Sequence, residues 1–361
     1  MIGVGHVEVR RADIRKARLV ASDPPAIGEG EILLAIETYA LTTNNVTYAA
    51  TGGQLGYWKF FPADDADWGI VPVWGFARVE QSNAPRIDTG ERLYGFLPMA
   101  SHAVLRPDRL REHGLTDAMP HRADLPAVYN DYQRVSRMAD HDAALEDLQC
   151  LLQPLLATSW LLYDFLADND WFGAEQIIIG SASSKTGLGL AKFLAEAKPD
   201  APHIAGLTSP ANRAFVEGLK ACDQVVTYDA VAADIAKIPS VYVDMAGNAT
   251  VRRALHEHLG DEMKHSSAVG TSHWDKFAPT GDLPGAKPVF FFAPAQIAKR
   301  REEWGPGVVQ QKIGEAWRRI ARSSGDWLAV EAAAGLDGAV QTWSDLAAGR
   351  QRPDIGHVLR M

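Results

Sequence analysis

The sequence predicts an α/β protein with two domains, a small β-barrel-like domain and a doubly wound parallel sheet with helices on both faces. The chain has 361 residues, which is enough for two domains. Residues 1 to about 110 hold short strand-like segments separated by Gly and Pro, which is typical of a small barrel. From about residue 150, apolar strand-like and helix-like segments alternate, which indicates a parallel sheet.

In the first domain the expected strands are residues 30–40 and 70–80, and residues 88–96 are expected to form a turn followed by a short strand. The segment 30–40 follows a Gly-Glu-Gly turn, and Pro72 places the segment 70–80 near an edge or a bend. Residues 111–149 are polar and irregular, and we interpret them as an insertion in a domain that spans 1–149.

The second domain is expected at 150–293. Its predicted strands are 175–180, 203–208, 224–228, 240–244, 266–270 and 289–293, and its predicted helices are 151–166, 188–198, 211–220 and 251–259. A tail at 294–361 follows, with helices at 295–304 and 308–323. The second of these ends in Arg318, Arg319 and Arg322, which we expect to form a solvated face.

The composition excludes several classes of protein. A net charge of −9 argues against a protein that binds a nucleic-acid backbone. Two cysteines, Cys150 and Cys222, can form neither a disulfide framework nor a cysteine-rich zinc site. The first residues lack a signal peptide, and we find no apolar stretch near the ~18–20 residues that span a bilayer. We therefore expect a cytoplasmic protein with no nucleic-acid or membrane partner.

The most informative local feature is the segment 180–189, Gly-Ser-Ala-Ser-Ser-Lys-Thr-Gly-Leu-Gly, between a buried strand and a helix. A helix N-terminus binds anions because its first N–H groups lack partners and its dipole is positive there. Small residues let the backbone approach a pyrophosphate, and hydroxyl groups add donors. The candidate phosphate-binding residues are Ser181, Ser183, Ser184, Lys185, Thr186 and Gly187.

Three interpretations of this segment remain open. It could be a dinucleotide-binding turn that is richer in serine than usual, which we favour. It could be a P-loop, since Lys185-Thr186 and Asp244 match parts of that pattern, but the second glycine of the motif is missing. It could also be only a tight strand-to-helix turn.

The end of the next strand indicates which dinucleotide is bound. NAD-selective sheets place an Asp or Glu there to accept a hydrogen bond from the ribose. Here the strand 203–208 is followed by Ser209, Asn212 and Arg213, with no acid, and these groups suit a 2′-phosphate. We therefore expect NADP(H) as the cofactor. Tyr228, which ends the next strand, could contact the same phosphate or only close the sheet.

The order of these segments resembles the medium-chain dehydrogenase/reductase superfamily, near its zinc-independent quinone-oxidoreductase-like branch. The resemblance rests on the turns and strands already described and on further segments with the expected order, at 40–48, 243–248, 268–271 and 335–359. It implies an N-terminal GroES-like β-barrel domain plus a Rossmann sheet, with residues 294–361 returning to the catalytic domain. It also places Asn248, Gly270 and Thr271 at the cofactor.

The departures from the superfamily pattern are informative as well. Zinc-dependent members carry a catalytic Cys and a Gly-His-Glu, whereas this chain has no Cys before Cys150 and has Val73-Trp74-Gly75-Phe76 in the corresponding place. We therefore expect no metal site. The serine-rich turn is one residue longer than the usual glycine-rich turn, which suggests a poorly characterised offshoot family.

The resemblance implies hydride transfer, in which the cofactor supplies the chemistry and the protein holds the acceptor. Without zinc, a developing oxyanion needs hydrogen-bond donors. Tyr48 is the first candidate donor, Tyr57 the second, and Asn45 an orienting amide beside Asn44. Tyr129, Asn130 and Tyr132 of the insertion could shape a pocket.

Together these features predict a zinc-independent NADP(H)-dependent oxidoreductase that reduces an activated C=C or C=O bond of an apolar, quinone-like carbonyl compound. The alternatives are a non-catalytic NADP(H)-binding or redox-sensing protein on the same fold and, with less support, a P-loop-like nucleotide enzyme. The apolar segment 289–292 could pair across a two-fold axis in a homodimer, or it could be buried within the sheet.

Overall fold

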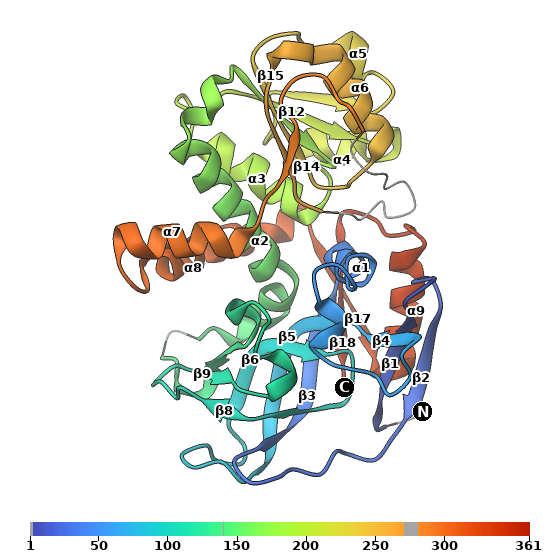
Figure 1. Ribbon diagram of the computed structural model, residues 1–361, viewed down its shortest axis with the longest axis vertical. Helices are drawn as coiled ribbons and strands as arrows, with labels where there is room; N and C mark the ends of the chain where they lie inside the picture. Colours follow the sequence, from blue (N-terminus) through green and yellow to red (C-terminus); the bar gives the residue numbers. More distant parts are fainter. Residues whose placement is uncertain (1–2, 140, 271–280) are drawn as a thin grey trace. The chain divides into compact units, whose positions relative to one another are not determined.

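The computed structural model describes residues 3–139, 141–270 and 281–361 (Figure 1). The chain divides into two units, Met1–Leu151 with Ala329–Met361, and Leu152–Leu328. The expected tail 294–361 is thus divided between them, because residues up to Leu328 belong to the second unit and the return to the first begins at Ala329.

The first unit is built on antiparallel strands. A three-stranded sheet has the order β2-β1-β4, and a nine-stranded sheet has the order β17-β18-β3-β5-β6-β10-β9-β8, with β7 paired to β3. The strands from the N-terminal part are β1 (Gly5–Arg10), β2 (Ala17–Ala21), β3 (Ile32–Leu41), β4 (Trp68–Ile70), β5 (Pro72–Ser82), β6 (Arg92–Pro98), β7 (His102–Leu105), β8 (Pro107–Asp108), β9 (Gly114–Asp117) and β10 (Asp131–Arg134). The segment expected to be irregular therefore contributes β9 and β10 to the sheet, where β10 pairs with β6.

The C-terminal residues complete this unit. Strands β17 (Ala329–Ala334) and β18 (Ile355–Arg360) are parallel to each other, and β18 is antiparallel to β3. Helix α9 (Gly335–Ala347) connects them, and its Trp343 donates a hydrogen bond from Nε1 to the Ile14 carbonyl oxygen at 2.8 Å. The last residues of the chain are thereby fixed to the first.

The second unit holds a six-stranded parallel sheet with the order β13-β12-β11-β14-β15-β16. The predicted doubly wound sheet is confirmed, with β11 (Gln176–Gly180), β12 (His203–Thr208), β13 (Gln224–Thr227), β14 (Ser240–Asp244), β15 (Met263–Ala268) and β16 (Pro288–Phe290). The helices of this unit are α2 (Glu146–Asp168), which begins in the first unit, α3 (Lys185–Glu196), α4 (Arg213–Gly218), α5 (Val231–Asp234), α6 (Ala249–Leu259), α7 (Ala293–Trp304) and α8 (Val308–Arg322).

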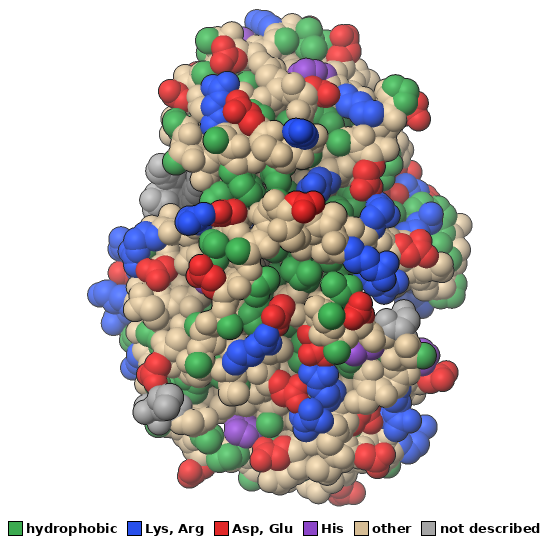
Figure 2. All heavy atoms as spheres, turned by 180° about the vertical axis from the view of Figure 1, so that it is seen from behind, with side chains coloured by type: hydrophobic (Ala, Val, Ile, Leu, Met, Phe, Trp, Pro, Cys, Tyr) green, Lys and Arg blue, Asp and Glu red, His purple; other side chains and the backbone are tan. Residues whose placement is uncertain are grey.

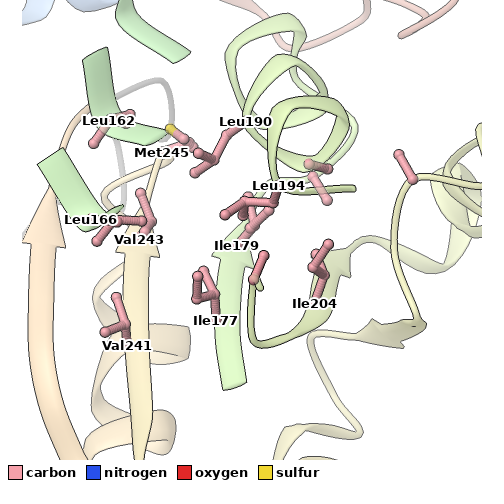
Figure 3. Packing of buried hydrophobic residues seen from close by; sticks show 14 of the residues in the cluster. Leu162, Leu166, Ile177, Ile179, Leu190, Leu194, Ile204, Val241, Val243 and Met245 are labelled. Atoms are coloured by element: carbon pink, nitrogen blue, oxygen red, sulfur yellow. The ribbon is translucent and has the colours of Figure 1, made fainter. Parts of the chain in front are cut away.

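Apolar helix faces cover both sides of this sheet. On one side, α2 and α3 pack against β11 and β14, and Figure 3 shows Leu162, Leu190 and Leu194 beside Ile179 and Val243. On the other side, residues of α5 and α6 pack against β11, β12 and β13. The central strands β11, β12 and β14 are therefore buried on both faces, which explains their largely apolar sequences.

Helix α2 corrects the expectation that the chain has no apolar segment long enough to span a bilayer. By length and composition the helix Ala143–Asp168 could cross a membrane, with a mean hydropathy of 1.3 in its most apolar window. However, 56% of that window is buried inside the protein, as in the core helix of a soluble domain. Its apolar residues contact the parallel sheet, and we assign them to the core.

The surface charges are mixed in sign. On the face drawn in Figure 2, basic and acidic side chains are interspersed. Helix α8 buries Val309, Trp317 and Ile320, whereas its Arg319 is exposed and pairs with Glu196 at 2.5 Å. The charged side of this helix is solvated, as predicted.

Two fully buried tyrosines of the first unit differ in how their hydroxyl groups are satisfied. The Tyr132 hydroxyl donates to the Phe96 carbonyl oxygen and accepts from Arg122 Nη1 at 3.0 Å. Among the described residues the Tyr39 hydroxyl has no hydrogen-bond partner, and burial raises its pKa. An unpaired buried hydroxyl lowers stability, so Tyr39 contributes through its ring alone.

We expect Tyr39→Phe and Tyr132→Phe to have different effects on the free energy of unfolding. Tyr132→Phe removes the hydrogen bond to the Phe96 carbonyl oxygen and the one from Arg122 Nη1, and should cost about 1–3 kcal/mol. Tyr39→Phe removes no hydrogen bond and should leave stability unchanged or slightly higher. Denaturant unfolding of both variants measures this, and equal losses would contradict the assignment.

Candidate functional site

The candidate nucleotide site lies at the carboxyl ends of the parallel strands. The chain runs from β11 outward through β12 to β13, then crosses to the other side of β11 for β14 and β15. The strand order therefore reverses between β11 and β14, whose ends align at Gly180 and Asp244. In open α/β sheets, ligands bind at such a switch point.

The turn that follows β11 is tight and polar. Ser184 is the N-cap of α3, and its Oγ accepts a hydrogen bond from the Gly187 N–H at 3.1 Å while donating to the Ser181 carbonyl oxygen at 2.7 Å. Ser181 has a φ of 54°, and a Cβ on Gly187 would lie 2.5 Å from the Ser181 carbonyl oxygen. The small residues are therefore required by the turn, and the N–H groups of the first turn of a helix, such as that of Thr186, are the ones that can bind an anion.

The structure brings the predicted phosphate turn and the predicted ribose site together. Ser183 is buried, and its Oγ accepts hydrogen bonds from Thr208 Oγ1 at 3.2 Å and from Asn212 Nδ2 at 3.3 Å. Asn212 and Ser209 belong to the turn after β12, where the Asn212 N–H donates to the Ser209 carbonyl oxygen at 3.0 Å. The two turns thus form one polar edge.

Arg213 is placed differently. It is the first residue of α4, is exposed, and donates from Nε to Glu217 Oε1 at 2.8 Å, one helical turn away. The Glu217 carboxylate raises the pKa of Arg213. An exposed pair of this kind contributes little to stability, so the guanidinium can exchange Glu217 for another anion at low cost.

Tyr228, which follows β13, contacts the turn after β11 and the end of β12. Burial raises the pKa of Tyr228, and its hydroxyl hydrogen-bonds to Ser181 in the turn after β11. Its backbone N–H donates to the Thr208 carbonyl oxygen at 3.1 Å. The side chain therefore supports the turn whether or not it also contacts a ligand.

At the end of β14 the sequence interpretation gave too little weight to Asp244. This buried carboxylate accepts hydrogen bonds from the N–H groups of Ala246 and Gly247 at 3.1 and 2.9 Å and lies 3.6 Å from Arg252 Nη1. Burial raises its pKa. Asp244 shapes the loop that leads to α6, where Asn248 is the N-cap.

The structure describes three of the four remaining cofactor candidates. Asn248 Oδ1 accepts from the Thr250 and Val251 N–H groups, so its carbonyl oxygen is used by the helix. The Gly270 N–H donates to the Asp244 carbonyl oxygen at 3.4 Å. Lys185 opens α3 beside Thr186. Thr271 lies outside the described residues.

In the first unit, Tyr48 and Tyr57 lie in one aromatic cluster. Tyr48 is buried on α1 (Thr43–Ala50), and its ring centroid is 4.4 Å from that of Tyr57, which opens the short helix η1 (Tyr57–Lys59). Trp74 Nε1 donates to the Tyr48 hydroxyl at 3.3 Å. Burial raises the pKa of both phenols, so both stay protonated at neutral pH and can act as hydrogen-bond donors.

Tyr129, which the sequence indicated only as a residue that could shape a pocket, joins this cluster. It ends the short helix η3 (Ala127–Tyr129), and its hydroxyl lies 2.9 Å from the Tyr57 hydroxyl. The Tyr-Asn-Asp-Tyr sequence at 129–132 was the available signal, but spacing alone does not bring residue 129 to residue 57.

Asn45 caps helix α1 and connects it to β5. Its Oδ1 accepts from the Thr42 N–H at 2.8 Å in a capping box, and its Nδ2 donates to the Pro72 carbonyl oxygen at 2.9 Å. Both ends of the buried amide are used. Asn45 therefore fixes α1, and with it Tyr48, against β5.

Within the described part of the chain, no group of three or more His, Cys, Asp or Glu side chains is arranged to hold a metal ion. Cys150 is buried in α2, and Cys222 is partly buried. That the protein acts without zinc stays a prediction.

Comparisons with known proteins agree with this architecture. A family model described as "Protein of unknown function (DUF2855)" matches residues 39–352. A comparison with curated proteins finds no match.

Among solved structures, CurA from Vibrio vulnificus in complex with NADPH has 14% identity, covers 99% of this chain and 98% of its own, and gives a TM-score of 0.64. The quinone oxidoreductase of Pseudomonas syringae has 14% identity, coverages of 99% and 100%, and a TM-score of 0.60. Mycobacterial Rv1454c complexed with NADPH has 13% identity, coverages of 99% and 100%, and a TM-score of 0.60. These likenesses confirm the predicted fold, GroES-like plus Rossmann.

We expect Asn45→Ala to lower the free energy of unfolding by about 2 kcal/mol, because it removes a helix cap and leaves the Pro72 carbonyl oxygen unpaired. Thr43→Ala, at an exposed position of the same helix, is the control and should be nearly neutral. Chemical denaturation measures both. If Asn45→Ala is as stable as the control, the structural role is wrong.

Proposed function

Because its match to the family model spans most of its length, the chain belongs to the DUF2855 family, and we propose that it is a zinc-independent NADP(H)-dependent oxidoreductase. In this proposal it reduces an activated C=C or C=O bond of an apolar, quinone-like carbonyl compound by hydride transfer.

The observation that carries the proposal is the Ser181–Gly187 turn at the switch point of the sheet. This is where a doubly wound sheet binds the pyrophosphate of a dinucleotide. The NADPH complexes of CurA and Rv1454c, which share the fold, support the choice of cofactor. The strand order is that of a dinucleotide sheet, so the P-loop alternative has no further support.

The residues present fit such a cofactor. The first turn of α3 would hold the pyrophosphate, with Lys185 adding positive charge. Ser209, Asn212 and Arg213 would surround the 2′-phosphate, and no Asp or Glu stands at the end of β12 to repel it. Asn248, Gly270 and Thr271 would lie farther along the cofactor. When bound, NADPH supplies the hydride, and the protein orients it.

The acceptor would be bound by the aromatic cluster of the first unit. Tyr48 and Tyr57 are neutral donors in apolar surroundings, which suits the stabilisation of a developing oxyanion without a metal ion. Asn45 keeps the helix that carries Tyr48 in place.

A second candidate is an NADP(H)-binding or redox-sensing protein without catalysis. It is favoured by the internal use of Ser183 and Ser184, whose hydroxyl groups bind Asn212 and Ser181 within the protein. Oxidation of NADPH in the presence of a panel of quinones, enones and aromatic aldehydes separates the two. Turnover supports the enzyme, and tight NADPH binding with no turnover supports the sensor.

We expect Arg213→Gln to weaken NADPH binding about tenfold and to leave NADH binding unchanged, because only NADPH presents a 2′-phosphate to the guanidinium. Glu217→Gln is the matched control. It removes the present partner of Arg213 and should leave NADPH affinity equal or higher. Calorimetric titration gives the affinities, and equal NADPH affinity in wild type and Arg213→Gln would remove Arg213 from the site.

The proposed homodimer has a structural candidate in β16. This strand is at the edge of the parallel sheet, next to β15. Its Val289 and Phe290 are exposed by 58% and 50%, and Phe292, which follows the strand, by 46%. The alternative that the segment is buried within the sheet is wrong. An exposed apolar edge strand favours pairing with another copy across a two-fold axis.

We therefore predict that the wild type is a dimer and that Phe290→Asp is a monomer when mass is measured by light scattering after size exclusion. A charge on the apolar edge would be buried by pairing and would prevent it. Val330→Asp, on the exposed edge strand β17 of the first unit, is the control and should stay dimeric. A monomeric wild type, or a dimeric Phe290→Asp, would refute this interface.

A further inference from the structure

The Tyr57 and Tyr129 hydroxyl groups hydrogen-bond to each other, and this single bond uses only one of their two hydroxyl hydrogens. Their oxygens are 2.9 Å apart, and either can be the donor. Whichever hydroxyl accepts still carries its own hydrogen, which has no acceptor among the described residues. A partly buried donor without an acceptor costs free energy, and a ligand oxygen that accepts from it recovers that cost.

The surroundings of this pair are aromatic. The Tyr129 ring centroid lies 4.7 Å from that of Phe96 and 5.4 Å from that of Phe60, and the Tyr57 ring lies against Tyr48. Trp74 is 6.2 Å from Tyr129. Flat rings on several sides favour a flat, conjugated ligand.

The surroundings are also uncharged. Burial raises the pKa of Tyr57 and of Tyr129, and the neighbours that act on these pKa values are Tyr48 and each other. Arg122, a buried cation on the segment that precedes Tyr129, is paired with Asp117 at 2.7 Å and also donates to the Phe60 carbonyl oxygen. A carboxylate brought to the tyrosine pair would lose its hydration without gaining a counter-ion.

Two exposed apolar side chains, which we call the apolar rim, lie within two residues of the tyrosines in sequence. Leu55 and Val128, which are close in sequence to the two tyrosines, are each 38% exposed. The two segments are in contact, because a Cβ on Gly56 would lie 3.2 Å from Leu125 Cδ2. The chain next to the two tyrosines therefore presents exposed apolar side chains, which suit an apolar ligand.

We propose that the Tyr57–Tyr129 pair is the specificity element for the acceptor: it selects neutral, flat carbonyl compounds and excludes carboxylates of the same size. The spare hydroxyl hydrogen donates to the carbonyl oxygen, and the rings and the apolar rim hold the rest of the molecule. This inference rests on the proposed function for the identity of the ligand as hydride acceptor, and it adds Tyr129 as a binding residue.

The test is equilibrium binding to the full-length protein of three probes with the same ring system, acetylnaphthalene, ethylnaphthalene and naphthoate, with and without NADPH. The probes present a carbonyl, no polar atom and a carboxylate, respectively. The variants are Tyr57→Phe, Tyr129→Phe and the double variant. Tyr39→Phe, which removes a buried hydroxyl with no partner, is the control.

In the wild type and the control we expect acetylnaphthalene to bind about tenfold more tightly than either other probe, as one net hydrogen bond allows. Each single variant keeps one hydroxyl free to donate and should keep most of this preference. The double variant should lose it, while its affinity for ethylnaphthalene stays the same. This non-additive loss distinguishes recognition by the pair from a general disturbance of the cluster.

The proposal is overturned if acetylnaphthalene does not bind in either state, if naphthoate binds equally well, or if the double variant keeps the wild-type preference. The proposed function fails separately, if NADPH neither binds nor is oxidised. If the probes bind as predicted but NADPH neither binds nor is oxidised, the proposal for the Tyr57–Tyr129 pair stands and the proposed oxidoreductase function is wrong.

Discussion

The turn between β11 and α3 is the constraint on which the second unit depends. A Cβ on Gly180 would lie 2.8 Å from the Tyr242 hydroxyl, and one on Gly187 would lie 2.5 Å from the Ser181 carbonyl oxygen. The chain can therefore reverse from strand to helix here only with small residues. The tight turn also places the N-terminus of α3 at the switch point of the sheet. The small residues that the turn needs are therefore also the ones that an anion site at a helix N-terminus needs.

The first unit supplies a different kind of surface. Its tyrosines come from separate segments, η1, η3 and α1, which are fixed by buried polar contacts such as the Asn45 capping box and the Arg122–Asp117 pair. These contacts hold the phenol rings in place without entering the cluster. Neutral donors in an aromatic setting suit a neutral acceptor.

Periodicity and turn residues predicted the parallel sheet well, because continuous apolar strands and amphipathic helices leave strong local signals. They did not predict α1 or α9, or the pairing of β10 with β6, which depends on contacts distant in sequence. The serines of the Gly180 turn were found by position, but the hydrogen bond from Asn212 to Ser183 and the Tyr57–Tyr129 pair require the tertiary structure.

The central claim is that the edge of the parallel sheet binds a phosphorylated dinucleotide. Calorimetric titration of the full-length wild type with NADPH tests it most directly. The account predicts saturable binding of one NADPH per chain with a micromolar dissociation constant. Absence of saturable binding at millimolar NADPH would contradict it.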